Sequence, residues 1–129
     1  MHDDTDFGYP MPDQTARYWA AACHAGAVVF VVVLGGGFVV SLLLWYFKRD
    51  ASPFIDMHGR EAVNFQLSAF VVMLVLTGLT ALLFRTCLAF LVAPIMVSFM
   101  LVVGALGVWA AYRALLGEPY RYPIALRFF

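Results

Sequence analysis

The sequence predicts an all-α integral membrane protein, and three observations lead to that fold class. Of the 129 residues, 64% are hydrophobic and only 12% are Asp, Glu, Lys or Arg. The mean hydropathy of +0.87 is too high for a water-soluble domain of this length, which could not bury so much apolar surface. The apolar residues also form long runs, as helices that cross lipid do. We therefore expect a compact bundle of four helical segments.

The first 14 residues are polar and acidic, and they lack the basic start and apolar core of a signal peptide. We expect residues 1–14 to be a flexible tail that precedes a transmembrane helical domain over residues 15–116. Both cysteines, Cys23 and Cys87, lie within or beside apolar runs without metal-ligand spacing, so we expect them to be inert.

The first apolar run, Tyr18 to Phe47, contains thirty residues without a charged side chain. A single helix of that length would measure about 45 Å, against a hydrocarbon core of about 30 Å. Gly35-Gly36-Gly37 lies within the run, where three glycines weaken a helix and permit a tight turn. The glycines favour a hairpin of two helices, from about Thr15 to Leu34 and from about Phe38 to Arg49. The alternative is one tilted span from about His24 to Phe47, which gives three transmembrane helices in all.

Two further apolar runs predict one membrane span each. The run from Ala62 to Phe84 ends at Arg85, and the run from Thr86 to Tyr112 contains Pro94, which should kink its helix. The chain closes with "GEPYRYPIALRFF", residues 117–129, in which two prolines disfavour a long helix. We expect this tail to be extended and to lie at the membrane interface.

The stretch "SPFIDMHGREAVNFQLS", residues 52–68, begins with a helix-start signal. Serine caps a helix, and proline fits the first helical position. On a helical wheel, four polar residues share an arc of about 120°, whereas Arg60 and Gln66 point elsewhere. The four residues are His58, Glu61, Asn64 and Ser68.

Polar groups that descend into a bilayer need partners within the protein. The C-terminal tail is a natural source of such partners, so the sequence predicts a cluster that joins the helix start to the tail. The residues assigned to it are Asp56, His58, Arg60, Glu61, Asn64, Gln66, Tyr120, Arg121 and Tyr122. An exchange of Glu61→Arg with Arg121→Glu would test the pairing. The alternative is a water-facing helix end without internal partners.

The basic residues predict the orientation, because they favour the cytoplasmic side. With four segments, seven basic residues lie on one side and only Arg85 on the other; with three segments, Arg17 joins Arg85. Both models place the loop over residues 48–61 and the C-terminus in the cytoplasm. We expect a multi-pass protein of the inner, cytoplasmic membrane.

No catalytic, metal-binding or cofactor-binding motif is evident, so we expect a protein that is not an enzyme and carries no cofactor. His24 is the one ionisable residue inside an apolar run, and we interpret it as a neutral hydrogen-bonding group. An improvised site of His58 with Glu61 or Asp56 is a weak alternative. The formal net charge of zero and the absence of a basic stripe argue against a nucleic-acid partner.

Two motifs suggest a family. The segment "HGREAVNFQ", residues 58–66, and the tail "GEPYRYPIALRFF" resemble a small bacterial and archaeal membrane family of unknown function that is Tic-twenty-like. Its plant relatives belong to the chloroplast inner-envelope import translocon. The resemblance covers about residues 15–129 and implies four helices, with a break in the first run.

These observations lead to two function hypotheses. The first is a non-enzymatic protein that acts through protein partners, in translocation, assembly or an accessory role. Its partners would be membrane lipids and other membrane proteins or further copies of itself. The second is a protein that binds a lipid or a small molecule in the cytoplasmic-side polar cluster.

Overall fold

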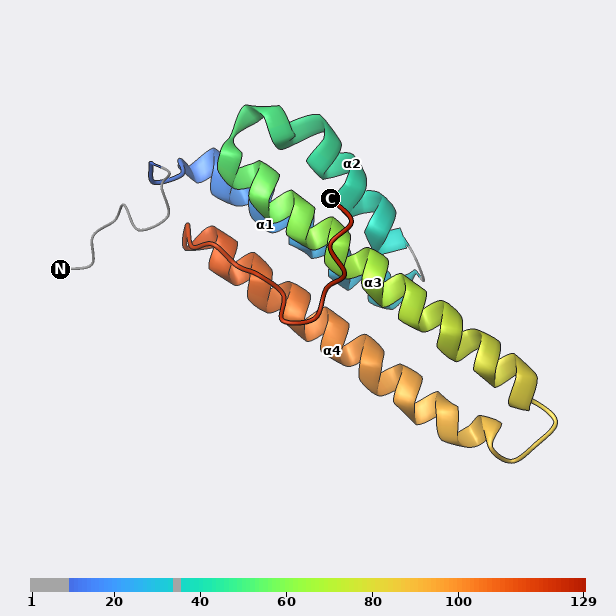
Figure 1. The fold of residues 1–129 in the computed structure, drawn as a ribbon. Coiled ribbons are helices and arrows are strands. Elements are labelled where there is room, and N and C mark those ends of the chain that lie inside the picture. Colours follow the sequence, from blue (N-terminus) through green and yellow to red (C-terminus); the bar gives the residue numbers. More distant parts are fainter. Residues whose placement is uncertain (1–9, 34–35) are drawn as a thin grey trace.

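The computed structural model describes residues 10–33 and 36–129, which form four α-helices and no strand (Figure 1). The helices are α1 (Gln14–Val32), α2 (Gly36–Lys48), α3 (Pro53–Leu83) and α4 (Ala89–Leu115), and a short 3-10 helix η1 (Arg49–Ala51) follows α2. The all-α prediction is therefore confirmed. Most of the predicted flexible N-terminal tail lies outside the described residues, and so does Gly35 of the predicted break.

The first apolar run forms a helical hairpin and not a single tilted span. α1 ends at Val32, α2 begins at Gly36, and the two helices pack against each other. With 13 residues, α2 is about 20 Å long and too short to cross a bilayer. Among the described residues, three helices (α1, α3 and α4) are long and apolar enough to do so.

Local sequence signals explain where the helices begin and end. The Asp13 side chain caps α1 by accepting a hydrogen bond of 2.8 Å from the Ala16 amide. Ser52 caps α3 in the same way, with its hydroxyl oxygen 3.2 Å from the Phe54 amide, and Pro53 occupies the first turn. After α4, Gly117 adopts a positive φ of 79°, the left-handed conformation that commonly ends a helix.

Pro94 does not interrupt α4, which is helical from Ala89 to Leu115. The predicted boundaries of the last two apolar runs are otherwise close to the observed helices. α3 begins at Pro53, nine residues before the apolar run, as the helix-start signal of Ser52-Pro53 predicted. Its first turns therefore carry the polar residues of the predicted cluster.

Small residues bring α1 close to its neighbours. Gly107 on α4 faces Ala27, and a Cβ atom at Gly107 would clash with the Ala27 side chain. Gly26 on α1 and Gly37 on α2 approach so closely that a Cβ atom on either would collide with the other helix. These contacts place the α1–α2 hairpin against only one half of α3 and α4.

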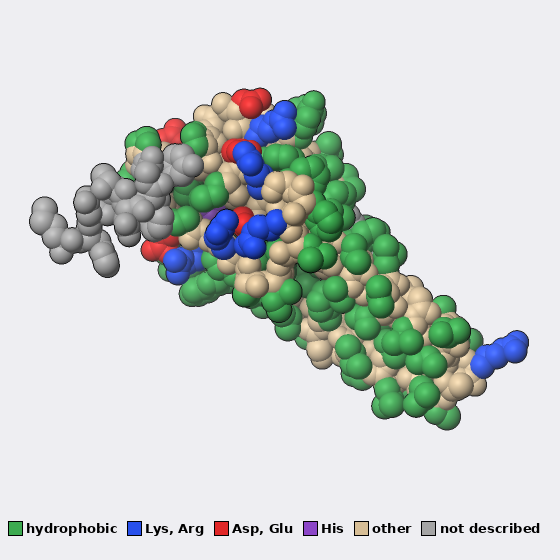
Figure 2. All heavy atoms as spheres, viewed as in Figure 1, with side chains coloured by type: hydrophobic (Ala, Val, Ile, Leu, Met, Phe, Trp, Pro, Cys, Tyr) green, Lys and Arg blue, Asp and Glu red, His purple; other side chains and the backbone are tan. Residues whose placement is uncertain are grey.

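The other halves of α3 and α4, after Met73 on α3 and before Leu101 on α4, continue together as a two-helix arm (Figure 1). On the face shown in Figure 2, the arm is apolar along its length and has one basic side chain at its tip, whereas the other basic and acidic side chains gather at the opposite end of the molecule. We call that opposite end the charged end; α1 and α3 begin there, and α2 and α4 end there.

Candidate functional site

The polar residues of α3 hold the C-terminal tail against the helices. We define the α3 polar stripe as His58, Glu61, Asn64 and Ser68. Its first two members contact the start of the tail: His58 Nε2 lies 3.1 Å from the carbonyl oxygen of Glu118, and the Tyr122 amide donates to Glu61 Oε2 at 3.3 Å. The tail therefore runs along the stripe from the first turns of α3.

The last two members of the stripe bind the end of the tail. Asn64 Oδ1 accepts hydrogen bonds from the amides of Phe128 and Phe129 at 3.0 and 3.1 Å. The Leu126 amide donates to the Ser68 hydroxyl at 2.8 Å. These backbone groups belong to a segment without helix or strand, so the stripe supplies acceptors that the tail itself lacks.

Glu61 also faces two cations of the tail. Its Oε1 lies 3.7 Å from Arg121 Nε and 3.5 Å from Arg127 Nε, while the Glu61 side chain is only 8% exposed. A carboxylate at that burial needs compensating positive charge. Glu61 therefore combines ion pairing through one oxygen with backbone recognition through the other.

A chain of hydrogen bonds runs through the interior between α1, α3 and the tail. We call it the histidine chain: Tyr122, His24, His58 and Glu118. The Tyr122 hydroxyl lies 2.9 Å from His24 Nδ1, and His24 Nε2 lies 2.8 Å from His58 Nδ1. Both imidazoles and the Tyr122 side chain are fully or almost fully buried.

The Glu118 carbonyl at the end of the histidine chain determines which atom donates and which accepts in each of its hydrogen bonds. The Glu118 carbonyl can only accept, so His58 carries its proton on Nε2. A neutral His58 then accepts at Nδ1 from His24 Nε2–H, and His24 Nδ1 accepts from the Tyr122 hydroxyl. Burial raises the pKa of Tyr122 well above its usual value, so its hydroxyl keeps the proton that it donates.

Aromatic packing fixes the Tyr122 side chain. Its ring stacks on Phe65 with a centroid distance of 3.8 Å and an interplanar angle of 1°. Tyr120 approaches Tyr122 edge-on at 5.1 Å and His24 at 6.4 Å. The tail is thus held by ring contacts as well as by hydrogen bonds.

Gln66 lies apart from the tail and joins three helices. Its Nε2 donates to the Ser41 hydroxyl on α2 at 2.6 Å, and that hydroxyl donates to the Cys23 carbonyl on α1. Gln66 and Ser41 are fully buried. This second polar chain fixes how the α1–α2 hairpin sits on α3.

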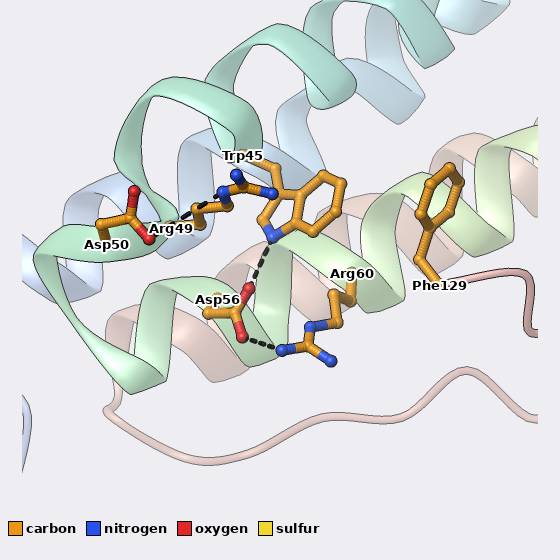
Figure 3. A pocket seen from close by; sticks show the side chains of 6 residues that line it. All are labelled: Trp45, Arg49, Asp50, Asp56, Arg60 and Phe129. Carbon is orange, nitrogen blue, oxygen red and sulfur yellow. Dashed lines mark hydrogen bonds and ion pairs between the residues drawn. The ribbon is translucent and has the colours of Figure 1, made fainter.

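Asp56 and Arg60 form an ion pair on the outside of α3, beside α2 (Figure 3). Trp45 Nε1 donates to Asp56 Oδ1 at 2.8 Å, and the Trp45 ring meets that of Phe129 at 5.5 Å. These residues, with Arg49 and Asp50, line an open cavity of about 420 Å³. Asp50 and Arg60 are largely exposed there.

The nine residues assigned to the cluster from the sequence therefore fall into three groups. One group contacts the tail or belongs to it: His58, Glu61, Asn64, Tyr120, Arg121 and Tyr122. Gln66 links helices, and the pair of Asp56 and Arg60 faces outward. A functional role for any of the nine stays a prediction.

Sequence reasoning left several participants in these contacts out of the cluster, namely Ser41, Trp45, Phe65, Glu118, Arg127 and Phe129. It identified His24 as a hydrogen-bonding group but did not assign it to the cluster. The sequence signal that could have assigned His24 to the cluster is its position inside an apolar run, where a polar side chain needs an internal partner. Within the described part of the chain, no group of three or more His, Cys, Asp or Glu side chains could hold a metal ion.

Comparison with curated proteins finds no match, and comparison with solved structures finds none either. A family model does match residues 15–129, that of the magnetosome magnetite crystal formation proteins, MamF/MmsF. This match overturns the resemblance to Tic-twenty-like proteins and removes the basis for a translocation role. The motifs that carried the resemblance contain the residues on the two sides of the tail contact. The chain is a membrane protein that belongs to the magnetosome magnetite crystal formation protein family.

Proposed function

We propose that the chain is a non-enzymatic membrane component of magnetite crystal formation that acts by contacting other proteins through its charged end. The observation that carries this proposal is the family match, which spans residues 15–129 and so includes the tail and all four helices except Gln14, the first residue of α1. The proposed location is the magnetosome membrane.

The contacts of His58 and Glu61 support a structural role for the polar cluster. Both ring nitrogens of His58 are engaged, by His24 and by the Glu118 carbonyl. Both carboxylate oxygens of Glu61 face groups of the tail. A general base needs a free lone pair that faces its substrate. In this arrangement the two residues direct their polar atoms to the protein itself.

The charged end offers an exposed surface of both signs. Arg49 and Asp50 are 41% and 94% exposed, and Arg60 is 52% exposed beside them. A polar partner protein can satisfy such groups, whereas the apolar arm suits lipid. Seven of the eight basic residues belong to this end by their place in the sequence, which supports a cytoplasmic orientation.

Complementation tests the proposal. A magnetite-forming bacterium that lacks the gene would receive Arg49→Glu or Asp50→Lys, with Arg85→Glu at the opposite end of the molecule as the matched control. We expect altered crystal dimensions in electron micrographs for the two charged-end variants only, at unchanged amounts of protein in the membrane. Wild-type crystals from both charged-end variants would contradict the proposed contact surface. Crosslinking would then separate a different partner protein from a second copy of this chain.

A second candidate function is the binding of an anionic lipid headgroup. An open cavity of about 410 Å³ is lined by three arginines, two carboxylates, Asn64 and three apolar residues. The arginines Arg60, Arg121 and Arg127 outnumber their ion-pair partners Asp56 and Glu61, and the apolar residues are Pro53, Met57 and Phe129. Guanidinium groups beside apolar surface match a phosphate attached to acyl chains. Native mass spectrometry tests this function: lipid that co-purifies should be lost in Arg121→Ala and kept in Arg85→Ala. Retention of the lipid in Arg121→Ala would contradict it.

A further inference from the structure

The α1–α2 hairpin ends partway along the longer helices, and its depth can be read from side-chain contacts. Gly117 faces Arg17, Gly107 faces Ala27 and Gly104 faces Val31, so α1 and α4 run antiparallel in a constant register. By this register Val33, the residue after α1, lies level with Leu101. α4 continues for twelve residues beyond that level, from Met100 to Ala89, which is about 18 Å.

The lengths of α3 and α4 mark where the bilayer lies. From Ala89 to Trp109, α4 rises about 30 Å, which equals the thickness of a hydrocarbon core. Trp109 and Tyr112 are both 51% exposed at this depth, as expected for aromatic residues at a membrane interface. On α3, the distance from Glu61 to Leu83 is about 33 Å. Both helices thus place the charged end at one interface and the α3–α4 loop at the other.

The arm is exposed in the way that lipid-facing helices are. No residue of α3 beyond Met73 is buried. Leu82 and Phe90, near the loop, are 81% and 82% exposed. These side chains require an apolar solvent over the whole length of the arm.

The length of α1 would also allow it to cross a membrane by itself, but its register argues against this. To centre α1 in a bilayer, the membrane would have to shift toward the charged end. Glu61, Arg121 and Arg127 would then enter the hydrocarbon, and much of the apolar arm would enter water. Both changes are unfavourable.

We infer that the α1–α2 hairpin is re-entrant: it enters and leaves through the charged end and occupies one leaflet only. Four helices then share the leaflet at the charged end, and two helices cross the other leaflet. Each helix is about 10 Å across, so the protein is broader in one leaflet than in the other (Figures 1 and 2). Such a wedge fits a membrane that curves with the charged end on its convex side. The lipid bilayer is thus the partner of this surface, independently of any role in crystal formation.

Depth measurements with nitroxide labels test the re-entrant hairpin. Single labels are placed on Val33→Cys and Leu101→Cys, both in a Cys87→Ser background, and on the native Cys87, which is exposed. Val33 and Leu101 are 56% and 64% exposed, so each can carry a label. We expect a water-soluble nickel chelate to reach Cys87 alone, and oxygen to reach the other two labels to the same extent. Equal access of nickel to Val33→Cys and Cys87 would show a hairpin that crosses the membrane and would overturn the inference.

The preference for curvature is tested with the orientation of the full chain in vesicles. An impermeant maleimide labels Cys87 from outside only when the charged end faces inward, since Cys23 is buried. We expect the unlabelled fraction to rise from large extruded vesicles to small sonicated vesicles of the same lipid. An equal fraction in both would overturn the wedge, whatever the depth of the hairpin.

Discussion

His24 on α1 and His58 on α3 share a buried hydrogen bond of 2.8 Å between Nε2 and Nδ1, although 34 residues separate them in the sequence. The Tyr122 hydroxyl and the Glu118 carbonyl, which terminate the chain of hydrogen bonds on either side, both belong to the C-terminal tail segment. The tail therefore closes a hydrogen-bonded circuit through two helices. The stability of the bundle and the position of the tail should depend on each other.

The change Tyr122→Phe removes one donor from this circuit. His24 Nδ1 would remain buried without its partner, and such a loss costs about 1–3 kcal/mol. We expect a lower free energy of unfolding in detergent, measured by circular dichroism, and faster proteolysis of the tail. Tyr120→Phe is the matched control, because the contacts of Tyr120 with His24 and Tyr122 are ring contacts that phenylalanine keeps. An equal loss in both variants would contradict the contribution of the Tyr122–His24 hydrogen bond.

Alkaline pH should reduce the contribution of Tyr122 to the stability of the folded chain. Burial, and to a lesser extent Tyr120 and Glu61, raise the pKa of Tyr122 above its ordinary value of about 10. Above about pH 10 the unfolded chain loses this proton while the folded chain keeps it, so folding becomes less favourable as the pH rises. The stability difference between wild type and Tyr122→Phe should therefore shrink between about pH 8 and about pH 11. A constant difference over this range would contradict the prediction.

The two functions of Glu61 can be separated by substitution. Glu61→Gln keeps an oxygen that can accept from the Tyr122 amide and removes only the charge that faces Arg121 and Arg127. Because both arginines are partly exposed, this change should cost no more than about 1 kcal/mol. Glu61→Ala also leaves the Tyr122 amide unpaired and should cost about 1–3 kcal/mol more. Chemical unfolding of both variants would measure the difference, and equal losses would show that charge alone matters.

The exchange of Glu61→Arg with Arg121→Glu should fail to restore stability. An arginine at position 61 would face Arg127, which contacts the same carboxylate oxygen as Arg121 does in the wild type. It would also offer no acceptor to the Tyr122 amide. The measurement is the free energy of unfolding of the double variant against each single variant. Recovery to the wild-type value would contradict this arrangement of Glu61.

The helices and the polar stripe were largely predictable because they depend on local patterns. Ser52-Pro53 starts α3 by capping, and the helical period alone gathers His58, Glu61, Asn64 and Ser68 on one face. Their contact with the tail followed from the need of polar groups in a membrane for internal partners.

The partners inside the bundle were harder to predict, and so was the depth of the hairpin. α1 is apolar on nearly all sides, so its sequence does not fix how it rotates about its axis. The pairing of His24 with His58, and of Gln66 with Ser41, depends on that rotation. The depth of the hairpin depends on the register of α1 against α4, which is set by the contacts of Gly104 and Gly107.

The crossing of α1, α2 and α3 depends on Gly37, and a pair of glycine substitutions tests it. A Cβ atom at Gly37 would collide with the Gly26 carbonyl oxygen and the Gln66 amide oxygen, and would lie 2.7 Å from Phe30 Cβ. Gly37→Ala should therefore cost about 1–3 kcal/mol through overpacking. At Gly78, in the arm, the added Cβ would meet nothing within 4 Å apart from the adjoining backbone of its own helix. Gly78→Ala should then raise stability by up to about 1 kcal/mol, because alanine favours the helix. Unfolding of both variants in detergent would measure these opposite effects. A Gly37→Ala protein as stable as the wild type would contradict the close approach of α2 to α1 and to Gln66.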